Sequence, residues 1–220
     1  MMFTFLRNNL TGWGQDLKSY QTLTNTGKYP GKKAIDSGCS LIDKLLAIYD
    51  SYEFFQAFNG KKEGLVSLSD DVHELKDFYT NQRPTWEKLQ DVMSNVFKPN
   101  RKELEKDSTA KQALARMDEI LSSENPYGML KEVNGLIEKV NVINDAAVVK
   151  RREESIKTLD EQITKVKEAL ELNKAEPDLR NKALKPLQDI KKQIQQEGSI
   201  PAISYYVDSA EEELEDSLEL

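Results

Sequence analysis

The sequence contains very little histidine and cysteine, with one residue of each among 220. The four Cys or His ligands of a structural zinc site therefore do not exist in the chain. A Ser-His-Asp or Cys-His catalytic group would have to use the single histidine, His73. Cys39 has no partner for an internal disulfide, which suits a reducing cytoplasm. We predict no catalytic residue, no metal, no cofactor and no small-molecule substrate for this chain.

Long apolar runs are also missing. No stretch approaches the ~20 apolar residues of a membrane span. The apolar start, Met1–Leu6, is short and lacks the basic residues that begin a signal peptide. We therefore predict a protein that stays in the cytoplasm and does not contact a membrane.

Positive charge is in the minority, because 31 Lys and Arg stand against 38 Asp and Glu, for a net charge of −7. Nucleic-acid binding draws mainly on neutralised phosphates, so this balance argues against nucleic acid as the partner. One local basic cluster, Lys150-Arg151-Arg152, is the best candidate for phosphate contacts; the alternative is a solvated helix face. A DNA-contacting arm would add further lysines, namely Lys182, Lys185, Lys191 and Lys192.

Strand signals are absent, whereas helix-favouring Ala, Glu, Lys, Leu and Gln fill the second half. We predict an all-α protein, an elongated multi-helix bundle with one long helix or a coiled-coil-like hairpin. Its expected parts are an N-terminal helical bundle (1–123) and a long-helix, coiled-coil-like C-terminal part (124–220). Apolar spacing and helix breakers predict helices over residues 11–23, 32–59, 62–80, 84–97 and 101–122, one from Pro177 that Pro186 kinks or divides, and one from Ser199. The helix over 101–122 is either straight or bent near Asp107-Ser108.

The segment between Pro126 and Pro177 contains no proline, which is room for one very long helix or a hairpin. A first apolar stripe there comprises Met129, Val133, Leu136, Val140, Ile143 and Ala147. A second comprises Ile156, Leu159, Ile163, Val166 and Leu170. Ala147 and Ile156 are nine residues apart, so at about 100° per residue the second stripe starts half a turn out of phase with the first. This predicts that the apolar seam moves to the opposite face of one helix; a bend near Lys150–Ser155 would give the same pattern.

Two surfaces are candidates for partner binding. Val142, Val149 and Ile156 recur at a seven-residue spacing, so they begin the second seam before the first one ends. Tyr205 and Tyr206 form a second candidate near the C-terminus. A partner would dock as a helix in a groove; alternatively, these side chains belong to the internal core.

Two strings are similar to chemical motifs and fail on detail. Gly27–Lys33 has three residues between its glycines, where a phosphate-binding loop has four, and Lys33 where that loop has Ser or Thr. We predict a turn there. Asp70, His73 and Asp77 share a helix face, but a di-metal bundle needs a second histidine. We predict a solvated acidic face.

Several aromatic residues cluster on the expected second helix and suit either a platform for stacked bases or a core. Their dense apolar surroundings favour the core. They are Tyr49, Tyr52, Phe54, Phe55 and Phe58.

Six strings distributed along the chain carry a family resemblance: Asn9–Gly14, Lys28–Lys33, Asp50–Phe55, Asn81–Trp86, Asn125–Glu132 and Leu179–Gln188. Over most of its length the chain resembles the C-terminal helical region of BrxC, the large P-loop ATPase of BREX phage-exclusion systems. The resemblance implies bacterial defence against phage, in a multi-protein complex with a DNA methyltransferase. It also implies that the ATPase machinery lies in another part of a longer parent, which fits the end at Leu220 in mid-pattern.

Three hypotheses for function come from these observations. The first is a non-catalytic interaction and assembly module of a BREX ATPase, which contacts other BREX proteins or itself. The second is a DNA-contacting helical arm. The third is a free-standing helical scaffold or adaptor without an ATPase parent.

Overall fold

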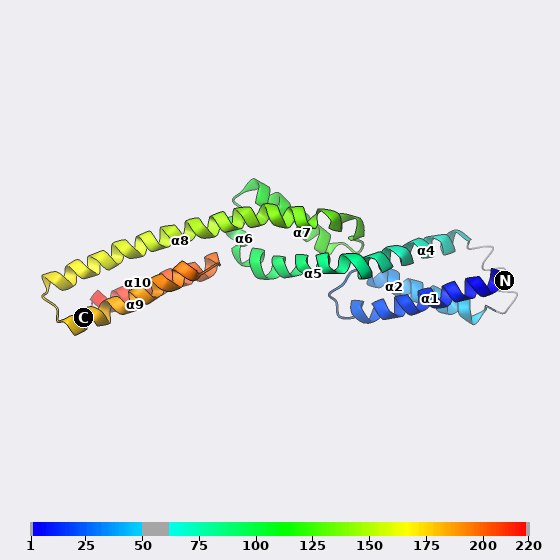
Figure 1. Cartoon of the computed structure of the whole chain (residues 1–220), viewed down its shortest axis with the longest axis horizontal. Coiled ribbons are helices and arrows are strands. Elements are labelled where there is room, and N and C mark those ends of the chain that lie inside the picture. Colours follow the sequence, from blue (N-terminus) through cyan, green and yellow to red (C-terminus); the bar gives the residue numbers. More distant parts are fainter. Residues whose placement is uncertain (1, 50–61, 219–220) are drawn as a thin grey trace. The chain divides into compact units, whose positions relative to one another are not determined.

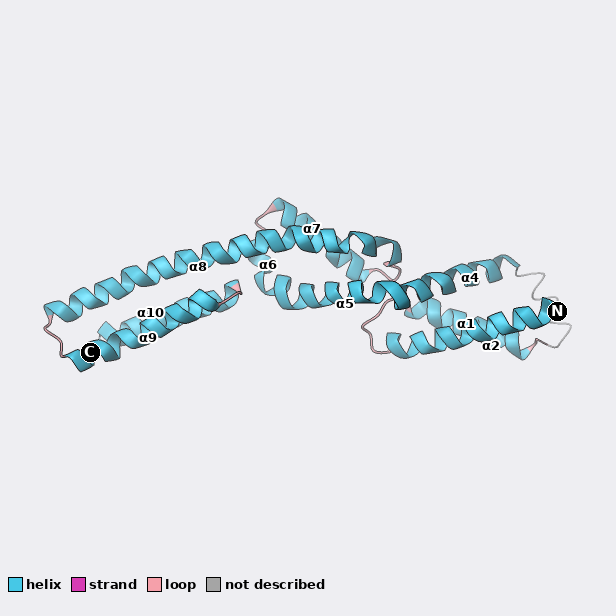
Figure 2. Ribbon diagram, viewed as in Figure 1, coloured by secondary structure: helices cyan, strands magenta, loops and turns pink. Residues whose placement is uncertain are grey.

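The computed structural model describes residues 2–49 and 62–218, and these residues form helices and connecting loops without a strand (Figures 1 and 2). The predicted all-α class is confirmed. The helices are α1 (Met2–Thr24), α2 (Lys32–Ala47), α4 (Lys62–Asp77), α5 (Arg83–Val92), α6 (Lys98–Leu104), α7 (Ser108–Ser122), α8 (Val133–Leu172), α9 (Pro177–Gln196) and α10 (Ile200–Leu218), with π-helical turns at Phe78–Gln82 and Met93–Phe97 and a 3-10 turn at Tyr127–Glu132.

Backbone contacts divide the chain into two compact units, and each unit draws on two segments. Unit 1 combines Met1–Gln90 with Arg116–Asn134, and unit 2 combines Asp91–Ala115 with Gly135–Leu220. This differs from the single boundary at residue 123 that we expected. Helices α5, α7 and α8 each contribute residues to both units. No single cut in the sequence therefore separates the two units.

Unit 1 is built around the antiparallel pair α1 and α2. Leu10 and Leu17 of α1 and Ile35 and Ile42 of α2 are fully buried at helical spacing. The prediction for α1 was too short, because the helix begins at Met2 rather than Thr11. Within the described residues α2 ends at Ala47. The rest of the predicted helix, with the aromatic residues from Tyr52 to Phe58, lies mostly outside them.

Two prolines that we expected to separate helices lie instead inside one continuous helical path. The prediction of a break at Lys98-Pro99-Asn100 is wrong, and Pro84 does not start a new helix after a break. A π-turn precedes each proline, and the backbone N–H groups of Arg83 and Lys98 donate to the carbonyls of Phe78 and Met93, five residues earlier. Proline cannot donate to the carbonyl four residues before it. The widened turn shifts the hydrogen-bond register by one residue just ahead of this gap.

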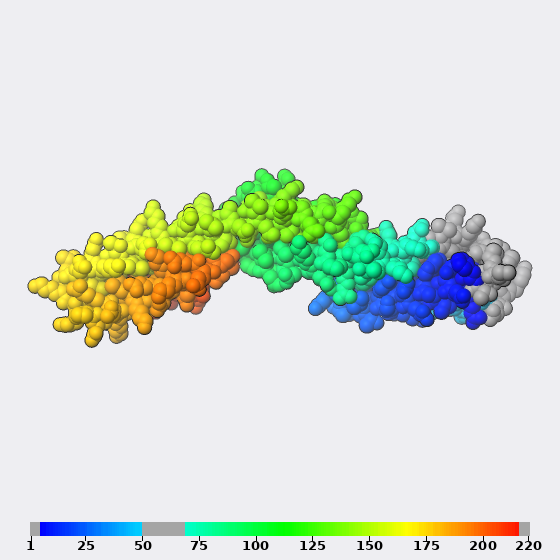
Figure 3. Space-filling model, viewed as in Figure 1, coloured from blue at the N-terminus to red at the C-terminus, as the bar shows by residue number. Residues whose placement is uncertain are grey.

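Unit 2 is built around α8, a single uninterrupted helix of 40 residues. Leu159, Ile163, Val166 and Leu170, predicted as the second stripe, are buried against a core that includes α9 and α10. In the space-filling view the side chains of α8 and α9 meet along this face (Figure 3). Pro177 begins α9 as predicted, whereas Pro186 does not divide that helix.

The predicted jump of the apolar seam to the opposite face of α8 is wrong. The buried row runs continuously along the helix through Val140, Asn144, Val148, Ser155 and Leu159. Asn144 and Ser155 occupy buried positions in this row, and a search for apolar residues skips both. The predicted first stripe instead followed Ile143 and Ala147, which are half-buried on the neighbouring side of the helix.

Candidate functional site

The main candidate surface is an exposed apolar face of α8 in unit 2. Val142 is 67% exposed and Val149 is 45% exposed. They lie two helical turns apart on one face, with the exposed Ala146 between them. Because isolated apolar residues are common on surfaces, the informative feature is that three share a face, with the exposed Asp145 along one edge of it.

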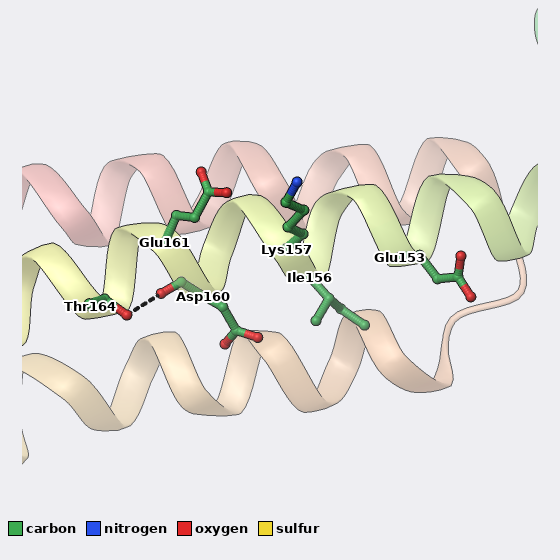
Figure 4. Close-up of a pocket in the computed structure, with 6 residues that line it drawn as sticks. All are labelled: Glu153, Ile156, Lys157, Asp160, Glu161 and Thr164. Atoms are coloured by element: carbon green, nitrogen blue, oxygen red, sulfur yellow. Dashed lines mark hydrogen bonds between the residues drawn. The ribbon is translucent and has the colours of Figure 1, made fainter.

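Ile156, which we predicted with these valines, is only half-buried and packs against the core of unit 2. It lines a shallow groove on α8 that Figure 4 shows in close-up, with Ile156 and Asp160 pointing toward α9 and Lys157 and Glu161 pointing away from it. The Asp160 carboxylate accepts hydrogen bonds from Lys191 Nζ at 2.6 and 2.7 Å. This part of α8 is therefore engaged with α9.

The two predicted tyrosines behave differently from each other. Tyr205 of α10 is 66% exposed. Tyr206 is half-buried and packs against the core of unit 2. Their ring centroids are 5.7 Å apart in a T-shaped arrangement. Tyr206 thus supports Tyr205, which presents the exposed ring.

The basic cluster predicted to contact phosphates is divided between solvent and structure. Lys150 is exposed, with its Nζ 3.9 Å from a Glu154 oxygen. Arg151 Nη2 donates to Ser204 Oγ at 3.2 Å, and Arg152 Nη2 donates to the Glu197 carbonyl at 2.5 Å. The two arginines thus hold the end of α9 and the first turns of α10 against α8.

The lysines of α9 are similarly divided. Lys191 is paired with Asp160, and Lys192 Nζ lies 3.0 Å from Asp189 Oδ1. Lys182 and Lys185 are exposed. The basic groups that we predicted for a DNA-contacting arm do not form one free row.

A buried polar chain, which the sequence analysis missed, fixes the start of α10. Asn100 of α6 and Asn144 of α8 are 3% and 4% exposed. Asn100 Nδ2 donates to Asn144 Oδ1 at 2.7 Å, and Asn100 Oδ1 accepts from the Ile200 amide at 3.0 Å. The available signal was an asparagine inside an apolar helical row. Buried polar groups need partners, so such a residue marks a specific contact.

The loop that is similar to a phosphate-binding loop is closed onto aromatic side chains of unit 1. The Lys28 carbonyl accepts hydrogen bonds from Trp86 Nε1 and Gln90 Nε2, each at 2.9 Å. Gly31 has a φ of 85°, and a Cβ there would lie 2.4 Å from Tyr127 Oη. Burial raises the pKa of the Tyr127 phenol, whose oxygen is buried without a hydrogen-bond partner. The geometry supports the predicted turn.

The residues considered for metal binding are engaged locally. His73 Nδ1 lies 2.6 Å from the Ser69 carbonyl, and the Asp77 carboxylate accepts from Asn81 Nδ2 at 2.7 Å and from Gln82. These hydrogen bonds lower the pKa of Asp77. Across residues 2–49 and 62–218 no group of three His, Cys, Asp or Glu side chains is placed to hold a metal ion.

Cys39 is buried in α2 as expected, and burial is the main cause that raises the pKa of its thiol. None of the helices in the described part of the chain is long and apolar enough to cross a membrane.

Comparison with known proteins bears on the first part of the chain. No solved structure matches it. Residues 1–101 match the family model described as the BREX ATP-binding protein BrxC alpha helical domain. That description names a helical domain of an ATP-binding protein rather than a catalytic domain. Over residues 1–101 the chain is therefore similar to a helical region of BrxC, as its sequence predicted.

Proposed function

We propose that this chain is a non-catalytic interaction module of a BREX phage-defence ATPase, and that it makes protein–protein contacts within the defence complex. The family match over residues 1–101 supports the BREX context. The single observation that carries the interaction role is the exposed apolar face of α8 at Val142, Ala146 and Val149. We further propose that the module acts in the cytoplasm and that it lies in the C-terminal part of the parent protein.

The partner that fits this face is an amphipathic helix of another BREX protein. Valine and alanine side chains are short, so a second helix can approach α8 closely along the two turns they cover. Lys139 and Glu153 lie beyond the two ends of the face along the helix and are exposed. A partner helix with a narrow apolar stripe bounded by opposite charges would satisfy both. Tyr205 of α10 is a separate candidate contact, because exposed aromatic rings are enriched at interfaces.

The test is an affinity pull-down with the whole chain as bait, in lysate of a host that carries a BREX system, read by mass spectrometry. The wild-type chain should enrich other BREX proteins, and the double variant V142D/V149D should lose them. Burying a carboxylate at an apolar contact is strongly unfavourable.

The matched control is Leu172→Asp. Leu172 is an 84% exposed apolar residue at the end of the same helix, beyond the proposed face. It should enrich the same proteins as the wild type. Equal enrichment by the double variant, or recovery of the bait alone by the wild type, would refute the docking surface.

A further inference from the structure

A hollow of about 500 Å³ opens in unit 2 where α8 meets the start of α10 and the end of α6. It lies on a different face of α8 from Val142 and Val149, since Arg151 is displaced by about 160° from Val149 at 100° per residue. The charged and polar residues that line it are Glu103, Lys106, Lys150, Arg151, Glu154 and Ser204.

The charges around this hollow are not balanced. Lys106 is paired with Glu103, and Lys150 lies 3.9 Å from Glu154, so each carboxylate has a lysine beside it. Arg151 donates instead to a neutral hydroxyl, Ser204 Oγ. No ion pair joins Arg151 to a carboxylate within the described ranges. The lining therefore carries one positive charge in excess, and it resides on the guanidinium.

We propose that this hollow binds a phosphate group of a small molecule, with Arg151 as the principal contact. A guanidinium has five N–H donors in a planar fork that matches two phosphate oxygens, and Ser204 occupies only one of them. That hydrogen bond holds the fork in place. Lys150 can swing from its long 3.9 Å contact toward the bound anion. Ile200, the first residue of α10, also lines the hollow, so the positive end of that helix dipole lies beside it.

A small phosphorylated molecule fits the geometry better than a nucleic-acid backbone. Three elements enclose the site, and only one unpaired cation contributes. Duplex DNA is bound through many phosphates by a row of cations, and the lysines of α9 do not form such a row. This site is independent of the proposed docking face, and either proposal can fail without the other.

The experiment is a titration of the full chain with inorganic phosphate, followed by the backbone amide signals of Arg151, Ser204 and Ile200 in a nitrogen–proton correlation spectrum. Sodium chloride at matched ionic strength is the reference. Phosphate should shift these signals saturably, and chloride should not.

Four variants make the test specific. Arg151→Ala should weaken phosphate binding at least about tenfold, which is the loss of one charge-assisted hydrogen bond. Glu154→Gln should strengthen binding by a few-fold, because it removes a negative charge and releases Lys150. Lys182→Ala removes the same charge as Arg151→Ala from an exposed site outside the hollow and should change binding less than twofold. If Arg151→Ala has the same thermal unfolding temperature as the wild type, its weaker binding is not caused by lost structure. If Arg151→Ala unfolds, Arg151→Lys replaces it as the test variant, because it keeps the charge.

Three results would overturn the proposal: shifts that chloride reproduces, an affinity for phosphate that Arg151→Ala leaves unchanged, or no gain from Glu154→Gln. Tighter and competing binding of duplex DNA at the same amides would assign the site to nucleic acid and overturn the small-molecule assignment.

Discussion

The buried contact between Asn100 and Asn144 provides the sharpest test of the packing in unit 2. Asn144→Ala removes the oxygen that accepts from Asn100 Nδ2 at 2.7 Å, in a site where both residues are almost fully buried. A buried donor without an acceptor costs about 1–3 kcal/mol. Alanine favours helix over asparagine by about 0.6 kcal/mol, which offsets part of this cost.

The control corrects for helix propensity. Asn141→Ala makes the same change on the same helix at a half-buried position and should stabilise the protein by up to about 0.6 kcal/mol, the propensity gain alone. Stability is measured by urea unfolding with far-UV circular dichroism. The exchange rate of the Ile200 amide is measured as well, because that amide donates to Asn100.

A double-mutant cycle with Asn100→Ala completes the test. Once one asparagine is removed, removal of the other should cost less, so the coupling free energy should reach about 0.5–3 kcal/mol. The Ile200 amide should exchange faster in every variant that lacks Asn100. Additive losses, or equal effects of Asn144→Ala and Asn141→Ala, would refute the assigned role of this contact.

Three further predictions concern single side chains. Gly31→Ala should destabilise unit 1 more than Gly27→Ala, because both have positive φ but only the Gly31 methyl group would meet Tyr127 Oη; equal losses of unfolding free energy would contradict this steric argument. Tyr127→Phe should be neutral or stabilising by about 1 kcal/mol, because it removes a buried hydroxyl without a partner. Since burial raises the pKa of Tyr127, its neutral form contributes full stability below about pH 10, and that contribution is lost as pH rises through the folded pKa. Urea titrations above that pH should show a smaller loss in Tyr127→Phe, and an identical loss would reject the burial explanation. Arg152→Ala should destabilise unit 2 by about 1–3 kcal/mol through loss of its bond to the Glu197 carbonyl, whereas Lys150→Ala should change little; similar urea midpoints for both variants would count against a structural role for Arg152.

The helices themselves could largely be predicted from local signals. The absence of proline between Pro126 and Pro177 allowed one long helix, and α8 is that helix. Pro177 suits a first helical turn, where no intrahelical donor is needed, and α9 begins there. Helix propensity and apolar spacing act within a few residues, so they can be evaluated along the sequence.

The two prolines inside the helical path, Pro84 and Pro99, were predicted wrongly. Proline usually breaks a helix, yet Pro84 and Pro99 lie in a continuous helical path. The π-turns before them require contacts that hold a wide turn in place, and the buried Phe78 and Met93 begin these turns. Such contacts come from residues distant in sequence, so a local rule could not include them.

The candidate sites depended still more on the tertiary structure. The basic string Lys150-Arg151-Arg152 is uniform in sequence, yet one side chain faces solvent and two hold neighbouring helices. The hollow at Arg151 combines residues from α6, α8 and α10 and the turn after α6, so no spacing along the chain could reveal it.

The sequence by itself determined that this chain is helical, where most of its helices begin, and that its first part is similar to a helical region of BrxC. Only the tertiary structure decided which row of α8 is covered. Each residue advances a helix by about 100°, so α8 has two apolar rows on different faces. The two rows are similarly apolar, so their composition does not tell which of them is buried. The neighbours of α8 make the choice: they cover a row that includes Asn144 and Ser155 and leave Val142 and Val149 exposed to solvent.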